Sequence, residues 1–456
     1  MTYTENTNVV IVGAGIFGMS TALWMLETGK YSVTLLDKSE VLPAPDAAST
    51  GEPCLIIRAA DYKDPLIAAL ALDAVEHWRK PEWEGTYHEC GVVALSATHE
   101  KEGMEFIDCA YKNCRDLGLD VTLLPDATAI KPVVDRNNAF PTGSFGGRQG
   151  YINPIGGWGE AGRAVEVGLT RAKKLGAIVR AGSEVIGLIK DGKNVKGVEL
   201  KSGEKIFCDL VVVAAGAWTP KLFASPAFAA RLPPIVATGQ SVAILQLTPE
   251  ESKKYAKVPV VFNLDDGWYI FPPNPTGLMK MAIHSAGYIN PVEEINNVSV
   301  PRTKLTPGAE DGAIPKVMLQ ALRKGLSEVY PDLAKKDYAM TRLCWYCDTV
   351  TGDWLIDYHP DYNNLFLATG GSGHAFKFAS NIGREILRLI ERDSSSEFKV
   401  RFSFNPPKEM VEPPSEKGDV SAERTQVTDT GADVRSGMRK LLVIDELIRP
   451  EDLKAY

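Results

Sequence analysis

The sequence is poor in cysteine, carries no excess of positive charge and contains a single long uncharged run. Its 456 residues include only seven cysteines. This number is small for a disulfide framework, and because it is odd the cysteines cannot all be paired. A reducing, cytoplasmic setting is therefore expected. The formal net charge is −8, from 50 Lys+Arg against 58 Asp+Glu. Such a chain has no broad positive field to hold a polyanion, so nucleic acid is not expected as a partner.

The uncharged run, Asn6 to Leu26, raises the question of a membrane span. A signal peptide needs a basic region before its apolar stretch, but Met1 to Thr7 supplies only Glu5. The run also divides into a short β-branched segment, a glycine turn and a helix, so no membrane partner is expected. The last residues, Leu453 to Tyr456, do not match the Ser-Lys-Leu peroxisomal address.

Hydrophobic periodicity predicts a β-α-β unit at the N-terminus. A buried strand over 8–12 is followed by a glycine turn over 13–18, a helix over 19–28 and a second strand over 31–36. Further helices are expected over 64–78, 160–175 and 314–326. Strands are expected over 178–180, 184–190, 195–200, 205–207, 210–215, 236–247, 258–263 and 268–271, and a last strand–glycine–helix passage over 365–390. Residues 81–150 show no clear period.

The C-terminal part changes in character after Phe404. Residues 405–437 are polar and proline-rich, which predicts a stretch lying loose on the surface. Residues 438–447 have apolar positions at helical spacing, and we expect them to dock back on the body of the protein.

The glycine turn carries the Gly-x-Gly-x-x-Gly dinucleotide fingerprint. Gly13 permits a tight turn, Gly15 lets the backbone approach a pyrophosphate, and Gly18 lets the helix pack closely on the strand. The free N–H groups of the helix N-terminus then face the phosphates. Asp37 ends the second strand, where an acid accepts hydrogen bonds from ribose hydroxyls. The acid also favours a 2′-hydroxyl over a 2′-phosphate.

Two later passages favour FAD over NAD. Residues 209–218 and 364–378 resemble the second nucleotide-contacting strand and the C-terminal glycine loop of flavoproteins with two dinucleotide-binding folds. The fold class is therefore expected to be α/β (α+β overall), with a Rossmann-type FAD domain interleaved with an antiparallel-sheet substrate domain. The predicted cofactor-binding residues are Gly13, Gly15, Ile16, Phe17, Gly18, Asp37, Lys38, Ala215, Gly216, Gly371, Gly373 and Lys377.

Together these passages resemble the sarcosine oxidase family, within it the fungal branch of amadoriases (fructosyl amino acid oxidases), saccharopine oxidases and pipecolate oxidases. The most specific segment runs from Leu343 to Pro360 and is followed by the 370–377 loop. The resemblance covers nearly all of residues 8–402. It implies an FAD domain from 1–80, 152–230 and 342–402, a substrate domain from 81–151 and 231–341, and a partly irregular extension over 403–456.

The resemblance also assigns roles to residues. Cys344 matches a cysteine joined through its sulfur to the flavin, Arg58 and Lys377 match groups that hold a substrate carboxylate, and Lys280 matches a lysine thought to assist oxygen reduction. Without the resemblance, Cys344-x-x-Cys347 also fits two buried apolar cysteines. As half of a zinc site, the motif would need a second Cys/His pair at suitable spacing, which the sequence lacks. As a redox-active pair, it would need the sequence context of a thioredoxin, which is also missing.

The chain departs from its relatives at several positions. Leu55 stands where sarcosine oxidases place an arginine and amadoriases a lysine, and His284 stands where amadoriases carry an acid that engages substrate. Residues 402–407 replace an arginine-rich segment of the amadoriases. These differences argue against a sugar adduct, while Trp268, Tyr269 and Phe271 are expected to supply aromatic walls.

The sequence thus predicts a monomeric FAD-dependent oxidase that acts on a secondary-amine (N-alkyl) amino acid and uses oxygen, with Lys280 and His284 as catalytic candidates. The imine product would be hydrolysed or trapped, and hydrogen peroxide would be released. Four alternatives stay open: a dehydrogenase with another acceptor, an oxidative cyclase or demethylase for an N-methyl aromatic amino acid, a fructosyl amino acid oxidase, and a flavin-binding sensor without turnover. No metal is expected.

Overall fold

The computed structural model describes residues 6–136, 138–407, 410 and 439–455. Strands and helices alternate through this part of the chain, and the predicted α/β class with an added antiparallel sheet is confirmed. Within the described residues, no helix combines the length and the apolar character that a membrane crossing needs.

A six-stranded sheet forms the side of the molecule where nucleotide binding was predicted. Its strands come from three separate stretches of the chain and run parallel, except that the first two pair antiparallel. In spatial order the strands are β22 (Leu355–Tyr358), β23 (Leu365–Thr369), β13 (Leu210–Val213), β1 (Thr7–Val12), β2 (Tyr31–Leu36) and β9 (Ile178–Arg180). The central strands are continuous apolar runs because both faces of the sheet are covered.

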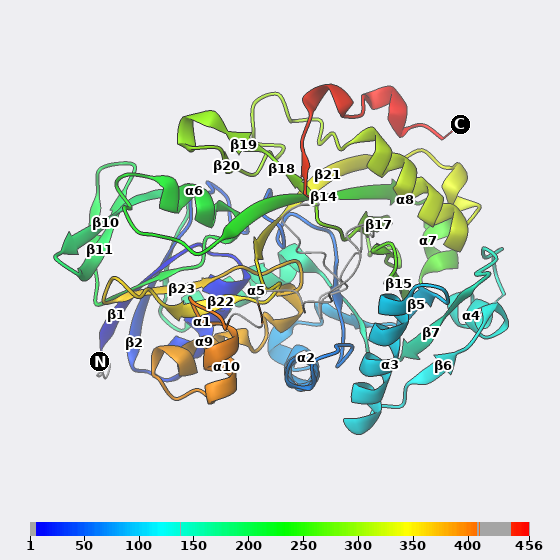
Figure 1. The fold of residues 1–456 in the computed structure, drawn as a ribbon, viewed down its shortest axis with the longest axis horizontal. Coiled ribbons are helices and arrows are strands. Elements are labelled where there is room, and N and C mark those ends of the chain that lie inside the picture. The colour runs from blue at the N-terminus through cyan, green and yellow to red at the C-terminus, as the bar shows by residue number, and fades with distance from the viewer. Residues whose placement is uncertain (1–5, 137, 408–409, 411–438, 456) are drawn as a thin grey trace, which may run out of the picture.

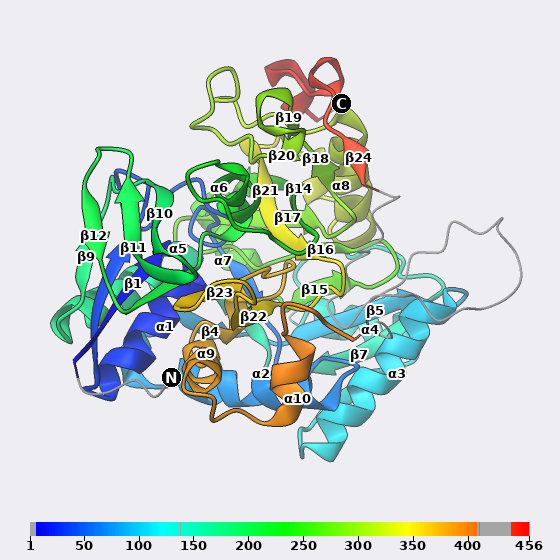
Figure 2. The same ribbon diagram turned by 60° about the vertical axis from the view of Figure 1, so that its left-hand side comes forward.

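The sheet lies between helices and a small second sheet. On one face, α1 (Ile16–Glu27) packs against α5 (Ala161–Lys174) and α9 (Ile382–Ile390). On the other face lies the meander of β10 (Val185–Asp191), β11 (Asn194–Leu200) and β12 (Lys205–Phe207). Figures 1 and 2 place this meander at one end of the molecule.

The glycine turn before α1 has the predicted close packing. Gly13 has a φ of +110°, and a Cβ there would lie 2.3 Å from the carbonyl oxygen of Ala214. A Cβ on Gly18 would lie 1.9 Å from the carbonyl oxygen of Gly13. The helix begins at Ile16, however, so the prediction that residues 13–18 are all turn is wrong: the third glycine already belongs to the first helical turn.

The other side of the molecule, where the substrate domain was predicted, is built on a ten-stranded mixed sheet. This sheet is mostly antiparallel. Its two longest strands, β14 (Ile235–Gln246) and β21 (Met340–Thr349), pair with each other over ten residues. The others are β5 (Val92–Ala97), β6 (Thr122–Leu124), β7 (Arg148–Asn153), β15 (Val260–Asn263), β16 (Trp268–Ile270), β17 (Leu278–Ile283), β18 (Tyr288–Ile289) and β24 (Lys440–Leu441).

The remaining elements frame these sheets. A three-stranded sheet of β3 (Leu55–Ile57), β8 (Gly157–Gly159) and β4 (Tyr87–Glu89) lies at the entry to α2 (Pro65–Trp78), and β19 (Pro291–Val292) pairs with β20 (Val298–Ser299). The other helices are α3 (Lys101–Asp116), α4 (Ala127–Val134), α6 (Thr219–Ala224), α7 (Pro249–Tyr255), α8 (Lys316–Val329) and α10 (Ser396–Arg401). Figure 2 shows α3 running along the β5–β7 edge.

The C-terminal segment does dock on the body, but not as the expected helix. β24 adds to the edge strand β18, and the segment continues as short 3-10 turns beside α8 (Figure 1, red). The amide of Ile448 donates to the carbonyl of Ile314, and that of Tyr338 donates to the carbonyl of Leu453. Most of the predicted loose stretch, residues 408–409 and 411–437, lies outside the described residues.

Candidate active site

A cavity of about 660 Å³ lies at the carboxyl ends of β1, β2 and β13. This is where open α/β sheets bind ligands, because helix N-termini and connecting loops meet there. The predicted cofactor-binding residues that line it are Gly13, Gly15, Ile16, Phe17, Asp37, Lys38, Ala215 and Gly216.

The wall of this cavity next to α1 suits a phosphate-bearing ligand. Gly15 is the N-cap of the helix and no side chain caps it, so backbone N–H groups of the first turn lack a capping partner from a side chain. A Cβ added to Gly15 or to Gly216 would meet no protein atom within 4 Å, which leaves room for a ligand against the backbone.

Asp37 lies farther along the same cavity. One carboxylate oxygen accepts from the amide of Ala14 and the other from the amide of Ser39, both at 2.9 Å. The residue thereby joins the end of β2 to the glycine turn. Next to it, the Lys38 ammonium lies 4.1 Å from the ring centroid of Trp218, which also lines the cavity.

A second cavity, of about 140 Å³, continues from the first toward the substrate sheet. The two share the wall residues Ile16, Phe17, Ala48, Ser49, Gly216 and Ala217. Its other walls include the predicted residues Arg58, Tyr269, His284, Cys344, Gly371, Gly373 and Lys377. Segments more than 300 residues apart in sequence therefore meet around one continuous space.

Two buried cations, Arg58 and Lys377, face this second cavity. Each is 3% exposed, and they flank one ring: the Arg58 guanidinium carbon is 4.2 Å and the Lys377 ammonium 5.8 Å from the centroid of Tyr62. They donate to the carbonyls of Asp61 and His374 respectively. Burial, together with the Arg58 charge, holds the pKa of Lys377 well below its usual range.

Neither cation has an ion-pair partner within 4 Å in the described part of the chain. The nearby carboxyl of Asp61 is occupied by other donors, namely Tyr151, Asn153 and the amide of Ala59. Burial raises the pKa of that carboxyl, and the carboxyl forms no ion pair within 4 Å with either cation in the described part of the chain. The site is therefore prepared to accept an anion.

His284 lies opposite these cations, directly after β17. Its Nδ1 is 3.3 Å from the Tyr346 hydroxyl, while its Nε2 is buried without a hydrogen-bond partner in the described structure. Burial, helped by the charges of Arg58 and Lys377, lowers the pKa of His284 to about 3. The imidazole is therefore neutral near pH 7 and has one ring nitrogen available to a ligand.

The two cysteines of the Cys344-x-x-Cys347 motif lie on β21 and both line the second cavity. Cys344 Sγ is 3.4 Å from the carbonyl oxygen of Ala48, whereas Cys347 Sγ is 3.6 Å from the Thr369 hydroxyl. Burial raises the pKa of each thiol to about 12. Among the described residues, no group of three or more metal-ligating side chains is arranged to hold a metal ion.

Lys280 lies behind the wall of the second cavity. Its Nζ is 6.0 Å from the ring centroid of Tyr269, which lines the cavity, and it donates to the carbonyl of Cys54 at 2.9 Å. The ammonium is also 2.8 Å from a carboxylate oxygen of Glu52. Burial acts to lower the pKa of Lys280, but the surrounding acidic groups, with Glu52 the foremost among them, together leave the pKa raised.

The expected aromatic wall needs two corrections. Phe271 does not line the cavity, because it is fully buried with its ring centroid 5.6 Å from that of Tyr269. Tyr269 lines the cavity, but its neighbour Trp268 does not, because successive side chains of β16 point to opposite faces of the sheet. Trp268 is 1% exposed, donates to the carbonyl of Leu322 and packs against α8 at Gly325. It is a core residue and not a substrate contact.

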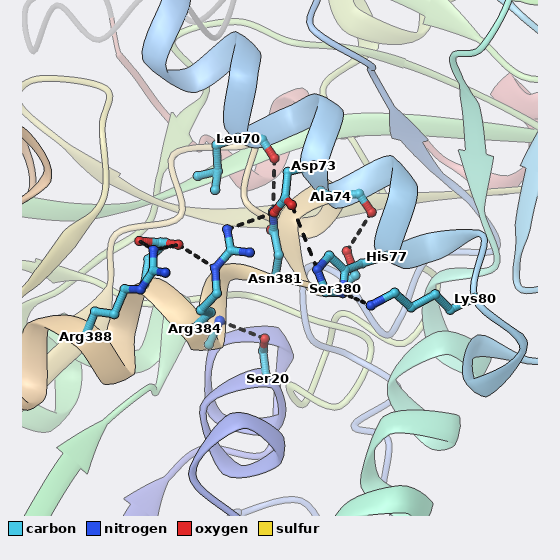
Figure 3. A network of polar contacts seen from close by, with 12 residues as sticks. Ser20, Leu70, Asp73, Ala74, His77, Lys80, Ser380, Asn381, Arg384 and Arg388 are labelled. Carbon is cyan, nitrogen blue, oxygen red and sulfur yellow. Dashed lines mark hydrogen bonds and ion pairs between the residues drawn. The ribbon is translucent and has the colours of Figure 1, made fainter. Parts of the chain in front are cut away.

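A polar network fixes the loop that carries Lys377 to α2 (Figure 3). Asn381 donates to the carbonyl of Leu70 and to the carboxylate of Asp73, and Ser380 donates to the carbonyl of Ala74. Arg384 reaches the same Asp73 carboxylate at 2.8 Å. On the loop itself, the indole of Trp78 donates to the carbonyl of Lys377 at 2.7 Å. These contacts set the position of the cation within the site.

Among the residues of the site region that sequence reasoning missed are Glu52, Phe262, Arg342 and Tyr346. Tyr346 could have been found, since it follows Cys344 by two residues on a strand and so shares its face. Glu52 and Arg342 have no local signal, because their ion pairs join segments far apart in the chain.

Comparisons with known proteins agree with this geometry. The model of the FAD dependent oxidoreductase family matches residues 8–389. L-saccharopine oxidase of Schizosaccharomyces pombe is 30% identical over 409 residues, covering 86% of this chain and 91% of the relative. Amino acid oxidase imqH of Aspergillus flavus is 29% identical and covers 84% and 92%. The structure of fructosamine oxidase (Amadoriase II) of Aspergillus fumigatus in complex with FSA superposes with a TM-score of 0.78 at 25% identity, covering 96% and 94%.

The chain therefore belongs to the FAD dependent oxidoreductase family. Sarcosine oxidase, saccharopine oxidase and amadoriase are among its relatives, as the sequence resemblance indicated, and the chain is an FAD-dependent enzyme of the amine and amino acid oxidase class. Family membership favours an enzyme over a flavin-binding sensor without turnover.

Proposed function

We propose that the protein oxidises the C–N bond of a secondary-amine (N-alkyl) amino acid, with oxygen as the electron acceptor, and yields an imine and hydrogen peroxide. The observation that carries the proposal is the pair of buried cations, Arg58 and Lys377, on the wall of a cavity continuous with the dinucleotide channel.

The two cavities fit FAD in a defined direction. The channel at Gly15 and Asp37 would hold the pyrophosphate and ribose, and the cavity lined by Cys344 would hold the flavin end, to which the Cys344 sulfur would be bonded. When bound, FAD supplies the group that accepts a hydride equivalent from the amine. The chain supplies the geometry and the charges around it.

The carboxylate of the substrate would occupy the space between the two cations. Charge-assisted hydrogen bonds from a guanidinium and an ammonium are strong in a site that excludes water. Binding of the anion would also favour the protonated form of Lys377, whose pKa is lowered in the free protein. The carboxylate of an amino acid would therefore neutralise positive charge that has no ion-pair partner in the free site.

The amine would bind uncharged, as oxidation requires. Arg58 and Lys377 disfavour a third positive charge nearby, and the neutral His284 provides no anion to hold an ammonium. Its free Nε2 can instead form a hydrogen bond with the substrate. An acid at this position would favour the protonated amine, so the histidine matters for the choice of substrate.

A second candidate is an oxidative cyclase or demethylase for an N-methyl aromatic amino acid. Three aromatic residues, Phe262, Tyr269 and Tyr346, line the same cavity as the cations. Their faces suit a ring on the substrate side chain. Leu55, which also lines this cavity, adds apolar surface where a charged residue would suit a sugar.

A substrate panel with two readouts separates these candidates. Sarcosine, pipecolate, saccharopine, N-methyl aromatic amino acids and fructosyl amino acids would each be mixed anaerobically with the protein, and loss of the oxidised flavin absorbance would be followed. Peroxide release would then be measured in air. Flavin reduction by an N-alkyl amino acid with peroxide supports the proposal, and reduction without peroxide indicates a different electron acceptor. Reduction by fructosyl amino acids alone would make the protein a fructosyl amino acid oxidase, and reduction by none of these amines would refute the proposed substrate class.

A further inference from the structure

Glu52, Lys280 and Arg342 form a buried ion cluster behind the flavin end of the cavity. One carboxylate oxygen of Glu52 lies 2.8 Å from the Lys280 ammonium, and the other lies 3.2 Å from Nε of Arg342. The side chains of Glu52 and Lys280 are 0% and 1% exposed. Two cations share one anion, so the cluster keeps a net charge of about +1, with Glu52 and Lys280 fully buried and Arg342 17% exposed at its edge.

The cluster is tied to the cavity wall on two sides. Arg342 and Cys344 are two residues apart on β21 and so lie on the same face of the strand. Arg342 also donates to the carbonyls of Asp46 and Ala47, in the segment that lines the dinucleotide channel. Glu52 therefore links the lysine to both the cysteine strand and the channel wall.

The other titratable groups around Lys280 are neutral near pH 7. They are Cys54, Tyr269 and Cys344, and burial raises the pKa of each to about 12. Burial also acts to raise the pKa of Glu52, but Lys280 and Arg342 hold it below its usual value. Glu52 is thus the anion among the groups that face the lysine.

We propose that Glu52 is a positioning residue that fixes the Lys280 ammonium behind the flavin end of the cavity and keeps it protonated. This inference rests on the proposed function, which gives Lys280 the task of assisting oxygen reduction. A flexible lysine buried without an anion would lose its proton, and with it the charge that stabilises developing superoxide.

The variant Glu52→Gln tests the inference because it removes the charge and preserves the shape. Burial is then opposed mainly by the hydrogen bond to the Cys54 carbonyl, and we expect the pKa of Lys280 to fall below the unfolded value of about 10.4. The cost of burying the protonated lysine is present at low pH and disappears as the pH rises toward about 10. The difference in Tm between the wild-type holoprotein and Glu52→Gln should therefore narrow between about pH 7 and pH 10.

Glu385→Gln provides a matched control. Glu385 is 2% exposed and also lies between two cations, Arg384 at 2.7 Å and Arg388 at 3.2 Å, but on α9. Arginine keeps its charge up to a pH of about 12 or more. The loss of Tm in this variant should thus stay constant over the same range. The inference would be overturned if the difference in Tm between the wild type and Glu52→Gln were also constant over this pH range.

Stopped-flow reoxidation of the reduced flavin gives a second, independent readout. The wild-type rate should stay level between about pH 7 and pH 10, and the rate of Glu52→Gln should fall as Lys280 loses its proton. Lys280→Met should be slower by about 10²–10³-fold at every pH. Normal reoxidation in Lys280→Met would refute the oxygen role in the proposed function, and the thermal comparison would still decide whether Glu52 holds the lysine's charge.

Discussion

The two lysines of the site, Lys280 and Lys377, are both buried, yet their surroundings shift their pKa values in opposite directions. Lys280 has the Glu52 carboxylate at 2.8 Å, and its pKa is raised. Burial and the charge of Arg58 both disfavour the protonated form of Lys377, so the pKa of Lys377 is lowered. The first lysine is suited to a permanent charge, and the second to a charge that forms when an anion binds.

The lowered pKa of Lys377 predicts that carboxylate binding weakens as the pH rises. Above that pKa the free site holds a neutral amine, so an anion must bind together with a proton. The Kd of a non-reactive carboxylate, followed by flavin absorbance, should rise with pH in the wild type and stay level in Lys377→Arg, whose charge does not titrate. Lys377→Met should bind about tenfold more weakly or worse at low pH. A wild-type Kd that is independent of pH up to about 10 would contradict this picture.

Cys344 and Cys347 should differ in their bond to the cofactor. Cys344 approaches the shared wall residue Ala48, while Cys347 is turned toward Thr369. We expect acid denaturation to leave flavin on the wild-type chain and on Cys347→Ala, but to release it from Cys344→Ala. Peptide mass spectrometry would locate the modified residue. Flavin retained by Cys344→Ala and lost from Cys347→Ala would reverse the assignment.

At the scale of elements, α2 and α9 hold the Lys377 loop through buried hydrogen bonds (Figure 3). Asn381→Ala would leave the carbonyl of Leu70 and the carboxylate of Asp73 without this donor. We expect a loss of about 1–3 kcal/mol in the free energy of unfolding and a higher KM for the amino acid substrate. Lys80→Ala, at the exposed end of the same network, should stay within about 0.5 kcal/mol of wild type in urea denaturation. Equal effects of the two changes would show that the buried contacts do not set the loop.

Elements with a strong local pattern were predictable from the sequence, and others were not. The strands at 31–36, 178–180 and 205–207 occur with the predicted bounds, because short apolar runs between turn residues leave little choice. The helix α3 was missed because its apolar positions are few and separated by charged residues. The segment after 438 forms an edge strand, since pairing with β18 outweighs its helical spacing.

The site was predictable only where a motif or a resemblance pointed to it. Gly13 and Asp37 carry a local spacing with a physical meaning, and Lys377 carried a family match. Trp268 was misassigned because all three residues of β16 are apolar or aromatic and buried. The sequence therefore did not show which of them face the cavity. Glu52 was missed because its role depends on partners at positions 280 and 342, which the fold alone brings together.

At the scale of the whole molecule, the dinucleotide channel joins three stretches of chain. Its walls come from residues 12–50, 183–226 and 294–296, so a bound cofactor touches both the nucleotide sheet and a loop of the substrate side. A ligand with this placement stabilises the folded state by an amount that grows with the logarithm of its concentration above Kd, about 2.7 kcal/mol at one hundred times Kd. The molecule should therefore depend on FAD for its stability as well as for its chemistry.

This dependence can be measured in Cys344→Ala, where the flavin is expected to bind without a covalent bond. After removal of the cofactor, the Tm should rise with each addition of FAD and should depend on its concentration. FMN and riboflavin lack the adenylate that the 660 Å³ channel would hold, so they should raise the Tm much less. Asp37→Ala in the same background should shift the FAD titration to higher concentration, because the ribose loses its acceptor and Ala14 loses a partner. If riboflavin stabilised the protein as strongly as FAD, the channel would contribute little to binding, and the flavin end of the site would account for the affinity.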